Sequence, residues 1–416
     1  MNWQPDESFA RALDAADPLR HYREQFHIPR RSDGSPVLYF CGHSLGLQPR
    51  AARALVEQEM EAWARLGVDA HFHGKNPWYS FHENFRESGA RLVGADPGEV
   101  VFMNSLTVNL HLMMMTFYRP TPSRYRILMD APVFPSDLYA MQSQLRHHGI
   151  EAGDGLLLVD PGDIELSLGE RGHEIAVVLL SGVNYLTGEY FDIPRLADAA
   201  RRQGCVFALD LAHAAGNVVL HLHDWQVDFA VWCSYKYLNG GPGSVGGCFV
   251  HDKHGRDVTQ PRLAGWWGND PATRFQMQAQ TDFVARAGAD GWQISNPPIL
   301  AMVPLLAALA LFDEAGMSAL RAKSERLTAY LYYLLKRLPS GAFEILTPSD
   351  PACRGCQLSL RLHDRPRELL AALQAEGVVC DFREPDVLRV APVPLYNTFH
   401  EVWTFAHILK RFINQA

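Results

Sequence analysis

The chain has 416 residues, of which 47% are apolar and 20% charged, and its formal net charge is -8. This length and apolar content allow a large buried core and indicate two lobes or domains. Because the net charge is negative and the arginines are scattered along the chain, no basic face for a nucleic-acid backbone is predicted.

Targeting and cysteine signals are weak. No apolar run approaches the roughly 20 residues that span a bilayer, and the segment MNWQPDESFARALDAAD is acidic where a secretory signal is basic and then apolar. We therefore predict a cytoplasmic location and no membrane partner.

The cysteines number seven and have no repeating spacing, which argues against a disulfide framework. Cys353 and Cys356 in CRGC form a redox motif, a zinc half-site or an incidental pair, and the sequence leaves their role open.

Residues 1–60 contain a polar arm, the loop YFCGHSLGLQPR and an amphipathic helix, AARALVEQEMEAWARLG, after Pro49. From about residue 90 to 250, short apolar runs alternate with polar or helix-like stretches. This alternation predicts an α/β fold with a mixed, mostly parallel sheet and crossover helices. The predicted strands are VVFM, RILMD, GLLLVD, IAVVLLS, VFALDL, DFAVWCS and GGCFV.

The pattern changes after Pro298, where long helices such as MSALRAKSERLTAYLYYLLKRL precede the short strands CQLSLRLH and VVCDFR. These elements predict a smaller α+β domain. The expected division is an N-terminal arm and helix at 1–60 that belongs to the small domain, a large domain at 61–310 and a C-terminal small domain at 311–416.

Polar residues close several of the predicted strands. Binding residues in such sheets lie at the carboxyl ends of the strands, in the crevice where loops leave the sheet. Ser181, Asp210 and Ser234 each end or follow an apolar run, so we expect them to converge at one edge.

The segment AVWCSYKYLNGGPGSVGGCFV places Lys236 between two tyrosines, after an apolar strand and before a cluster of glycines. An ammonium is rarely buried unless it is paired or used chemically. A desolvated lysine is the nucleophile that forms Schiff bases with carbonyls, including pyridoxal phosphate. The alternative is a strand-end lysine that reaches solvent.

The segment CVFALDLAHAAGN supplies a carboxylate, Asp210, and then His213. Pyridoxal phosphate works as an electron sink when a carboxylate keeps its ring nitrogen protonated. Asp210 precedes Lys236 by about one crossover unit, so the two residues are expected on neighbouring strands. A helix-capping role for Asp210 is the alternative.

Two segments offer groups for a phosphate and an aromatic ring. In NSLTVNLHLMMMTF, Thr107 supplies a hydroxyl, and the amides of Leu106 and Thr107 can point at an anion; a simple capped helix is the alternative. In APVFPSDLYAM, Phe134 can stack on a cofactor ring beside Ser136 and Asp137, or the segment is only a turn before a helix. The loop GGPGSVGG lacks the G-K-[ST] ending of a nucleotide-binding loop and precedes a strand, which excludes an NTPase reading.

Together these segments resemble the fold-type I, aspartate-aminotransferase-like enzymes that use pyridoxal phosphate, and among them the kynureninase family. The resemblance runs from residue 40 to about 397, nearly the whole chain, and SYKYLNGGPG with RVAPVPLYN is its most specific part. The matching segments are FCGHSLGLQP, GKNPW, NSLTVNLHLMM, FPSD, DLAHAAGN, CSYKYLNGGPG, AGWWG, SNPP and RVAPVPLYN.

The resemblance implies roles for individual residues. Lys236 would hold the cofactor as a Schiff base, Asp210 would pair with the ring nitrogen, and Arg389 would hold the substrate's α-carboxylate. Without the resemblance, Arg389 is equally a strand residue at the surface. The remaining cofactor residues are Leu106, Thr107, Phe134, Pro135, Ser136, Asp137, Ser181, His213, Tyr235, Trp266 and Asn296. A homodimer with shared active sites is implied, in which Trp266 and Asn296 come from the other subunit.

Members of this family convert L-kynurenine or 3-hydroxy-L-kynurenine and water to anthranilate or 3-hydroxyanthranilate and L-alanine, in tryptophan catabolism or on the route to nicotinamide cofactors. Lys236 would carry the proton from Cα, and an acid or base is needed at the γ-carbonyl. Tyr235 is the candidate for that group, with a pure phosphate anchor as its alternative.

Substrate preference depends on His71, Ser295, Asn296 and Trp267, which are expected near the substrate. His71 and Asn296 match the eukaryotic type, whereas Trp267 stands where that type has phenylalanine. Activity on both substrates, with a lean towards 3-hydroxykynurenine, is expected. His71 and His73 could also bind a metal, but no third ligand is apparent and no metal is predicted.

Three other readings remain. The chain could be an aminotransferase, a cysteine-desulfurase-like lyase or a non-catalytic protein that binds pyridoxal phosphate. Neither enzyme accounts for AGWWG or RVAPVPLYN, and a scaffold would not need Lys236, Asp210 and Arg389 together.

Overall fold

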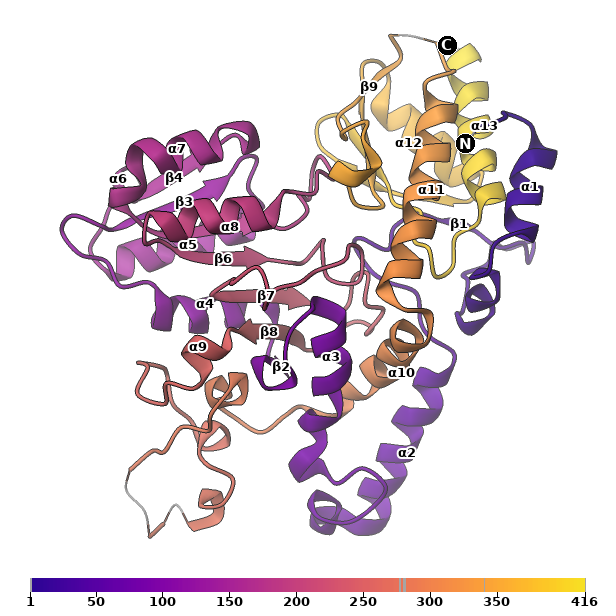
Figure 1. Ribbon diagram of the computed structural model, residues 1–416. Coiled ribbons are helices and arrows are strands. Elements are labelled where there is room, and N and C mark those ends of the chain that lie inside the picture. The colour runs from indigo at the N-terminus through magenta and orange to yellow at the C-terminus, as the bar shows by residue number, and fades with distance from the viewer. Residues whose placement is uncertain (1, 277, 280–281, 340, 416) are drawn as a thin grey trace.

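The computed structural model describes residues 2–276, 278–279, 282–339 and 341–415. Figure 1 shows two parts: a larger one built on a central sheet, and a smaller one that carries both ends of the chain. The site described below belongs mainly to the larger part.

The larger part contains a seven-stranded sheet in the order β2-β8-β7-β6-β5-β3-β4. The strands β7, β6, β5, β3 and β4 pair in parallel, whereas β8 is antiparallel to both β2 and β7. The predicted mixed, mostly parallel sheet is therefore confirmed. The strands are β2 (Val100–Met103), β3 (Arg126–Asp130), β4 (Leu156–Val159), β5 (Ile175–Ser181), β6 (Val206–Asp210), β7 (Phe229–Cys233) and β8 (Gly246–Val250).

Helices cover both faces of this sheet because its strands are apolar on both sides. In β5, Val178 and Leu180 belong to one core, while Val177 and Leu179 belong to the other. The first core is completed by α3 (Arg86–Val93), α7 (Ile164–Arg171), α8 (Ile193–Arg202) and α10 (Ile299–Ala315). The second is completed by α4 (Leu106–Phe117) and α5 (Pro135–His147).

The smaller part is a four-stranded antiparallel sheet in the order β12-β13-β10-β9, covered by helices. Its strands are β9 (Phe343–Ile345), β10 (Leu358–Leu362), β12 (Asp381–Arg383) and β13 (Val387–Val390). The short strands β1 (Leu38–Tyr39) and β11 (Val378–Val379) pair in parallel beside it. The helices are α1 (Glu7–Ala15), α11 (Met317–Leu335), α12 (Pro366–Ala375) and α13 (Phe399–Gln415), and all four contribute to a third core.

The N-terminal segment divides between the two parts. Helix α1 packs against α13, whereas α2 (Ala51–Leu66) packs against α10. The predicted boundaries at residues 60 and 310 stay a prediction. Two short helices, α6 (Ala152–Gly155) and α9 (Asp252–Gly255), complete the α-helices of the described chain. The 3-10 segments are Arg20–Gln25, Gly67–His71, Trp78–Phe85, Pro97–Glu99, Pro161–Asp163, Gly172–Glu174, Trp266–Gly268, Arg274–Gln276, Ala289–Trp292 and Pro351–Cys353.

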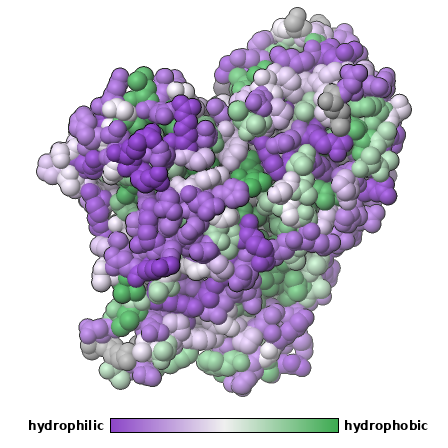
Figure 2. All heavy atoms as spheres, in the orientation of Figure 1, coloured by the Kyte–Doolittle hydropathy of each residue, from purple (hydrophilic) through white to green (hydrophobic). Residues whose placement is uncertain are grey.

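No single helix within the described residues is both long and apolar enough to cross a bilayer. Only α10 and α11 taken together pass that length and composition test, and they meet at an angle of 83°. Figure 2 shows a mainly hydrophilic face, with hydrophobic residues gathered in the hollow between the two parts.

Candidate active site

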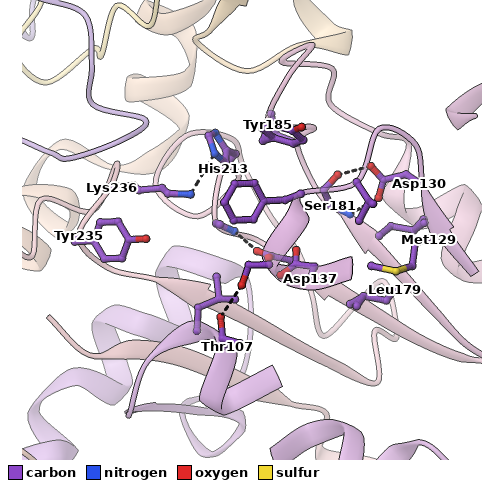
Figure 3. Close-up of a pocket in the computed structure, with 18 residues that line it drawn as sticks. Thr107, Met129, Asp130, Asp137, Leu179, Ser181, Tyr185, His213, Tyr235 and Lys236 are labelled. Carbon is purple, nitrogen blue, oxygen red and sulfur yellow. Dashed lines mark hydrogen bonds between the residues drawn. The ribbon is translucent and has the colours of Figure 1, made fainter. Parts of the chain in front are cut away.

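A cavity lies at the carboxyl ends of the parallel strands, where the switch-point rule places a ligand site. Its volume is about 140 Å³, and it is lined by charged, hydroxyl and apolar side chains. Figure 3 shows the Lys236 amine directed towards His213, and the Ser181 hydroxyl turned towards Asp130 at the far side of the cavity. The lining residues are Leu106, Thr107, Met129, Asp130, Val133, Phe134, Ser136, Asp137, Leu179, Leu180, Ser181, Val183, Tyr185, Asp210, Ala212, His213, Tyr235 and Lys236.

Lys236 follows β7 and enters the cavity half-buried. Its Nζ lies 3.2 Å from His213 Nε2 and 5.7 Å from the centre of the Phe134 ring. Burial, together with the charges of Lys236 and Arg389, lowers the pKa of His213 well below its usual range. The imidazole is therefore neutral and can exchange a hydrogen bond with the lysine amine.

Two carboxyl groups lie close together in the cavity. Asp210 ends β6, directly opposite Ser181 at the end of β5, and its Oδ1 accepts a hydrogen bond of 2.7 Å from the Ala212 amide. Asp137, in the first turn of α5, is buried beside it. Burial and the neighbouring Asp210 carboxylate raise the pKa of Asp137 well above its usual range. Asp137 is therefore held protonated beside the Asp210 carboxyl group.

The predicted convergence at the strand ends holds for Ser181 and Asp210. Strands β6 and β7 are parallel neighbours, as the spacing between Asp210 and Lys236 predicted. Ser234 is fully buried and does not line the cavity. The expectation for Ser234 is wrong, because the chain turns after Cys233 and directs Tyr235 and Lys236, but not Ser234, into the cavity.

Asp130 is a site residue that sequence reasoning missed. It ends β3 and accepts hydrogen bonds from the Ser181 amide at 2.8 Å, the Ser181 hydroxyl at 2.6 Å and Asn184 Nδ2 at 3.1 Å. Burial raises the pKa of Asp130. Its position at the end of the strand RILMD indicates a site residue, by the same rule that selected Asp210. The Ser181 hydroxyl thus fixes the cavity wall through Asp130.

The N-termini of α4 and α5 meet at one side of the cavity. Thr107, in the first turn of α4, and Ser136, in the first turn of α5, have their hydroxyl oxygens 3.3 Å apart. Helix N-termini carry unpaired amides and partial positive charge, which bind anions such as phosphate. Leu106 lines this region, and Pro135 occupies the first turn of α5 without lining the cavity.

Several predicted residues lie outside the cavity lining. Trp266, Trp267 and Tyr79 belong to an aromatic cluster in which the Trp266 and Trp267 ring centres are 4.7 Å apart. His71 packs edge-on against Trp78 at 5.4 Å. Ser295 and Asn296 also lie outside the lining, with the serine hydroxyl 3.1 Å from the asparagine Oδ1. Arg389 lies outside it as well and is fully buried in an ion pair with Asp381. The binding roles of these residues stay predictions.

The described residues also contain a group that could be mistaken for a metal site, Glu99 with His223 and His251. One Glu99 oxygen accepts from the Asp252 amide at 2.7 Å and lies 2.9 Å from His223 Nδ1. His251 Nδ1 accepts from the Lys253 amide. These atoms already have hydrogen-bond partners, so the group is a structural network between loops.

Of the CRGC pair, Cys353 is exposed and Cys356 is buried. Burial raises the pKa of the Cys356 thiol to about 12.

The donor set of the cavity fits pyridoxal phosphate. Lys236 provides an amine for its aldehyde carbon, Asp210 an anion for its ring nitrogen, and Phe134 a flat apolar surface. The two helix N-termini with Thr107 and Ser136 provide an anion site at the same cavity.

Comparisons with known proteins agree with this arrangement. A family model described as the kynureninase C-terminal domain matches residues 320–409. The chain is 54% identical to a kynureninase of Myxococcus xanthus, over 98% of this chain and 97% of the relative. It is 52% identical to a kynureninase of Koribacter versatilis, with the same coverage.

Solved structures of similar fold include a cysteine desulfurase of Thermococcus onnurineus, with a TM-score of 0.74, 17% identity and coverage of 91% of this chain and 95% of that one. A C-DES mutant with glycine covalently linked to its pyridoxal phosphate has a TM-score of 0.76 at 17% identity, with coverage of 93% and 98%. This likeness confirms the fold-type I prediction and carries no argument about the reaction.

Proposed function

The chain belongs to the kynureninase family, and from this premise we propose that it hydrolyses the Cβ–Cγ bond of L-kynurenine or 3-hydroxy-L-kynurenine. The products are L-alanine and anthranilate or 3-hydroxyanthranilate. The observation that carries the proposal is the position of Lys236 in the cavity, with its Nζ 3.2 Å from a neutral His213 and 5.7 Å from the Phe134 ring.

Bound pyridoxal phosphate supplies the electron sink that stabilises negative charge at the substrate's Cα. Lys236 would hold the cofactor at its aldehyde carbon, and its amine would move the proton at the substrate's Cα. His213 orients the lysine amine through its Nε2. Asp210 would pair with the ring nitrogen and keep it protonated, while the protonated Asp137 beside it would add no second negative charge.

Tyr235 is the proposed acid at the γ-carbonyl. Burial raises the pKa of Tyr235, so its phenol keeps its proton and can donate to the carbonyl oxygen as water adds. A pure phosphate anchor is the second possibility for this residue. Tyr235→Phe separates the two roles: an acid role predicts a large loss of kcat with unchanged cofactor affinity, and an anchor role predicts weaker cofactor binding.

Product identification tests the proposed reaction. The holoenzyme is expected to release fluorescent anthranilate and equimolar L-alanine from kynurenine. An aminotransferase would instead consume a keto acid without releasing anthranilate, and that outcome would refute the proposal.

The absorbance of the bound cofactor tests the role of Lys236. We expect Lys236→Ala to lose the wild-type cofactor band and the activity, and Lys410→Ala, which changes an exposed lysine on α13, to keep both. A Lys236→Ala variant with a wild-type spectrum and activity would refute the assignment.

Substrate preference and assembly rest on residues outside the cavity of one chain. We propose that a homodimer brings Trp266 and Asn296 to the partner's cavity, and that His71, Ser295 and Trp267 contact the substrate ring. Values of kcat/KM for both substrates test the lean towards 3-hydroxykynurenine. Sedimentation tests the dimer, and mixing inactive Lys236→Ala and Asn296→Ala proteins tests the sharing, because a mixed dimer regains one complete site.

A cytoplasmic location and a role in tryptophan catabolism or nicotinamide cofactor synthesis stay predictions. Growth of a deletion strain on tryptophan, with and without added nicotinate, distinguishes the two pathways.

A further inference from the structure

Arg389, the predicted carboxylate ligand, lies in a charged cluster whose other members have no assigned role. It is on β13, directly opposite Asp381 on β12, and its side chain has no exposed surface. Its Nη2 donates to Asp381 Oδ2 at 2.6 Å, and its Nη1 donates to the Tyr185 carbonyl at 2.7 Å. Tyr185 lines the cavity and Arg389 does not, so the guanidinium is held behind the cavity wall through the Tyr185 backbone.

Asp381 is itself held from two other directions. The Ser44 hydroxyl donates to Oδ2 at 2.6 Å, and Arg383 donates to Oδ2 from Nη2 at 3.2 Å. Arg383 Nε lies 3.1 Å from Oδ1. One carboxylate thus serves two guanidinium groups, which leaves the cluster of Asp381, Arg383 and Arg389 with a net charge of +1. That charge is matched to a single carboxylate of a ligand.

Arg389 also retains unused donors. Among the described residues, its buried Nε has no hydrogen-bond partner. A guanidinium has five N–H groups, and a carboxylate is best bound by two that point in parallel. An unpaired buried donor beside a cavity costs free energy unless a ligand accepts from it.

His43 stands next to the same cluster. It is buried, its Nε2 lies 3.9 Å from Asp381 Oδ2, and neither ring nitrogen has a partner among the described residues. Burial, with the charge of Arg389, lowers the pKa of His43 well below its usual range, so the ring is neutral. Its ring centre is 6.3 Å from that of His213, whose Nε2 meets Lys236. His43 therefore lies near both the cluster and His213, the neighbour of Lys236.

A metal ion is a poor occupant of this place, although Cys41, His43 and Asp381 lie close enough to share one. Asp381 is already paired with Arg383 and Arg389. A divalent cation would have to displace those bonds and lie beside two fixed positive charges, which costs far more than it gains. An anion from the ligand is the complementary occupant.

We propose that Asp381 is a positioning residue for the carboxylate site: it orients Arg389 and reduces the local charge to +1, so that the site receives one α-carboxylate. The inference rests on the proposed function and on the predicted role of Arg389 as the group that binds that carboxylate. Because Asp381 is anchored by Ser44 and Arg383, it stays in place and does not compete with the ligand. Removal of Asp381 frees Arg389 to turn and adds repulsion between the two arginines.

The test compares two ligands in the pyridoxal phosphate-loaded protein. L-Alanine carries the α-carboxylate, and the decarboxylated amine of kynurenine lacks it; their binding is read from the absorbance of the bound cofactor. For Asp381→Asn we expect the Kd of L-alanine and the KM of kynurenine to rise about tenfold, kcat to change less than about threefold, and the Kd of the amine to stay constant. Asp364→Asn, an exposed aspartate of the same part, is the matched control.

Equal losses for both ligands, no change, or tighter binding of L-alanine in Asp381→Asn would overturn the positioning role. If that variant does not fold, Ser44→Ala removes only one bond to Asp381 and should shift the same ratio between the two ligands in the same direction by a smaller factor. A wild-type protein that prefers L-alanine to the amine but releases no anthranilate would refute the proposed reaction alone. An active wild type with an unaltered Asp381→Asn ratio would refute the positioning role alone.

Discussion

Replacing Asp137 by asparagine should stabilise the apoprotein at neutral pH. Asp137 is buried beside Asp210, and both burial and that carboxylate raise the pKa of Asp137, while Lys236 lowers it by less. The folded chain therefore holds a proton that the unfolded chain releases above a pKa of about 3.9. In this interval the unfolded state binds fewer protons, so the free energy of unfolding falls as pH rises. Asparagine keeps a neutral polar group and removes this loss.

The size of the effect is bounded by the pH of the measurement. Each unit between the unfolded pKa and the pH costs about 1.4 kcal/mol, so the ceiling at pH 7 is about 4 kcal/mol. The position of Asp137 in the first turn of α5 favours its charged form and offsets part of this. We expect a gain of about 1–2 kcal/mol for Asp137→Asn at pH 7.5, and a smaller gain at pH 5.5.

The assay is urea denaturation of cofactor-free wild type and Asp137→Asn at both pH values. Asp154→Asn, an exposed aspartate in the first turn of α6, is the control and should show no pH-dependent difference. A difference between Asp137→Asn and wild type that does not grow with pH would refute the protonated Asp137. In the loaded protein, Asp137→Asn should keep its cofactor affinity, while Asp210→Asn should lose about 10- to 100-fold, because it removes a charge-assisted hydrogen bond.

Three further changes test stability. Lys323→Met leaves the buried Asp17 without the partner that lies 2.7 Å from it. The free energy of unfolding in denaturant should fall by about 3–5 kcal/mol, more than in the double variant with Asp17→Asn. A single variant as stable as wild type would contradict this. Burial lowers the pKa of His82 to about 3, so wild type should lose stability relative to His82→Gln as pH falls from about 6.5; an equal difference at pH 7 and pH 5 contradicts it. Gly247→Ala places a Cβ 2.0 Å from the Trp232 indole and should lower Tm, with a cost of about 1–3 kcal/mol; an unchanged Tm contradicts it.

Exposed positions of the same residue types provide the controls. Lys410→Met, His407→Gln and Gly153→Ala each change a side chain or backbone position in contact with solvent. The Cβ of Gly153→Ala would meet nothing within 4 Å. Each should alter the free energy of unfolding by less than about 0.5 kcal/mol.

The sequence predicts the central sheet well because most of its strands are short apolar runs with both faces buried; the edge strand β4 is only partly buried. In β5, Val177 and Val178 enter different cores, so consecutive positions of the strand have to be apolar. The same rule selected Ser181 and Asp210, since polar side chains at the carboxyl ends of parallel strands meet at one edge. The rule applies equally to Asp130 at the end of RILMD, a residue that the prediction left out.

The placement of Trp267 and Asn296 relative to the cavity did not follow from the sequence. Within its described residues, the segment that carries them contains only short 3-10 turns between loops, such as Trp266–Gly268 and Ala289–Trp292. Without a hydrophobic period or a strand register, composition gives no direction for their side chains. The pairing of β1 with β11 also could not be predicted from the sequence, because each strand has only two residues.

Arg389 is paired with Asp381, and pairing of this kind requires strand register that motifs do not contain. Arg389 can be identified from RVAPVPLYN alone, but Asp381 becomes its partner only because β12 and β13 pair residue by residue. Likewise, Asp137 stays protonated because α5 begins beside the end of β6. A motif thus identifies the charged residue, while the fold sets its protonation and orientation, and substitutions at Asp381 and Asp137 test the fold's contribution separately from the motif's.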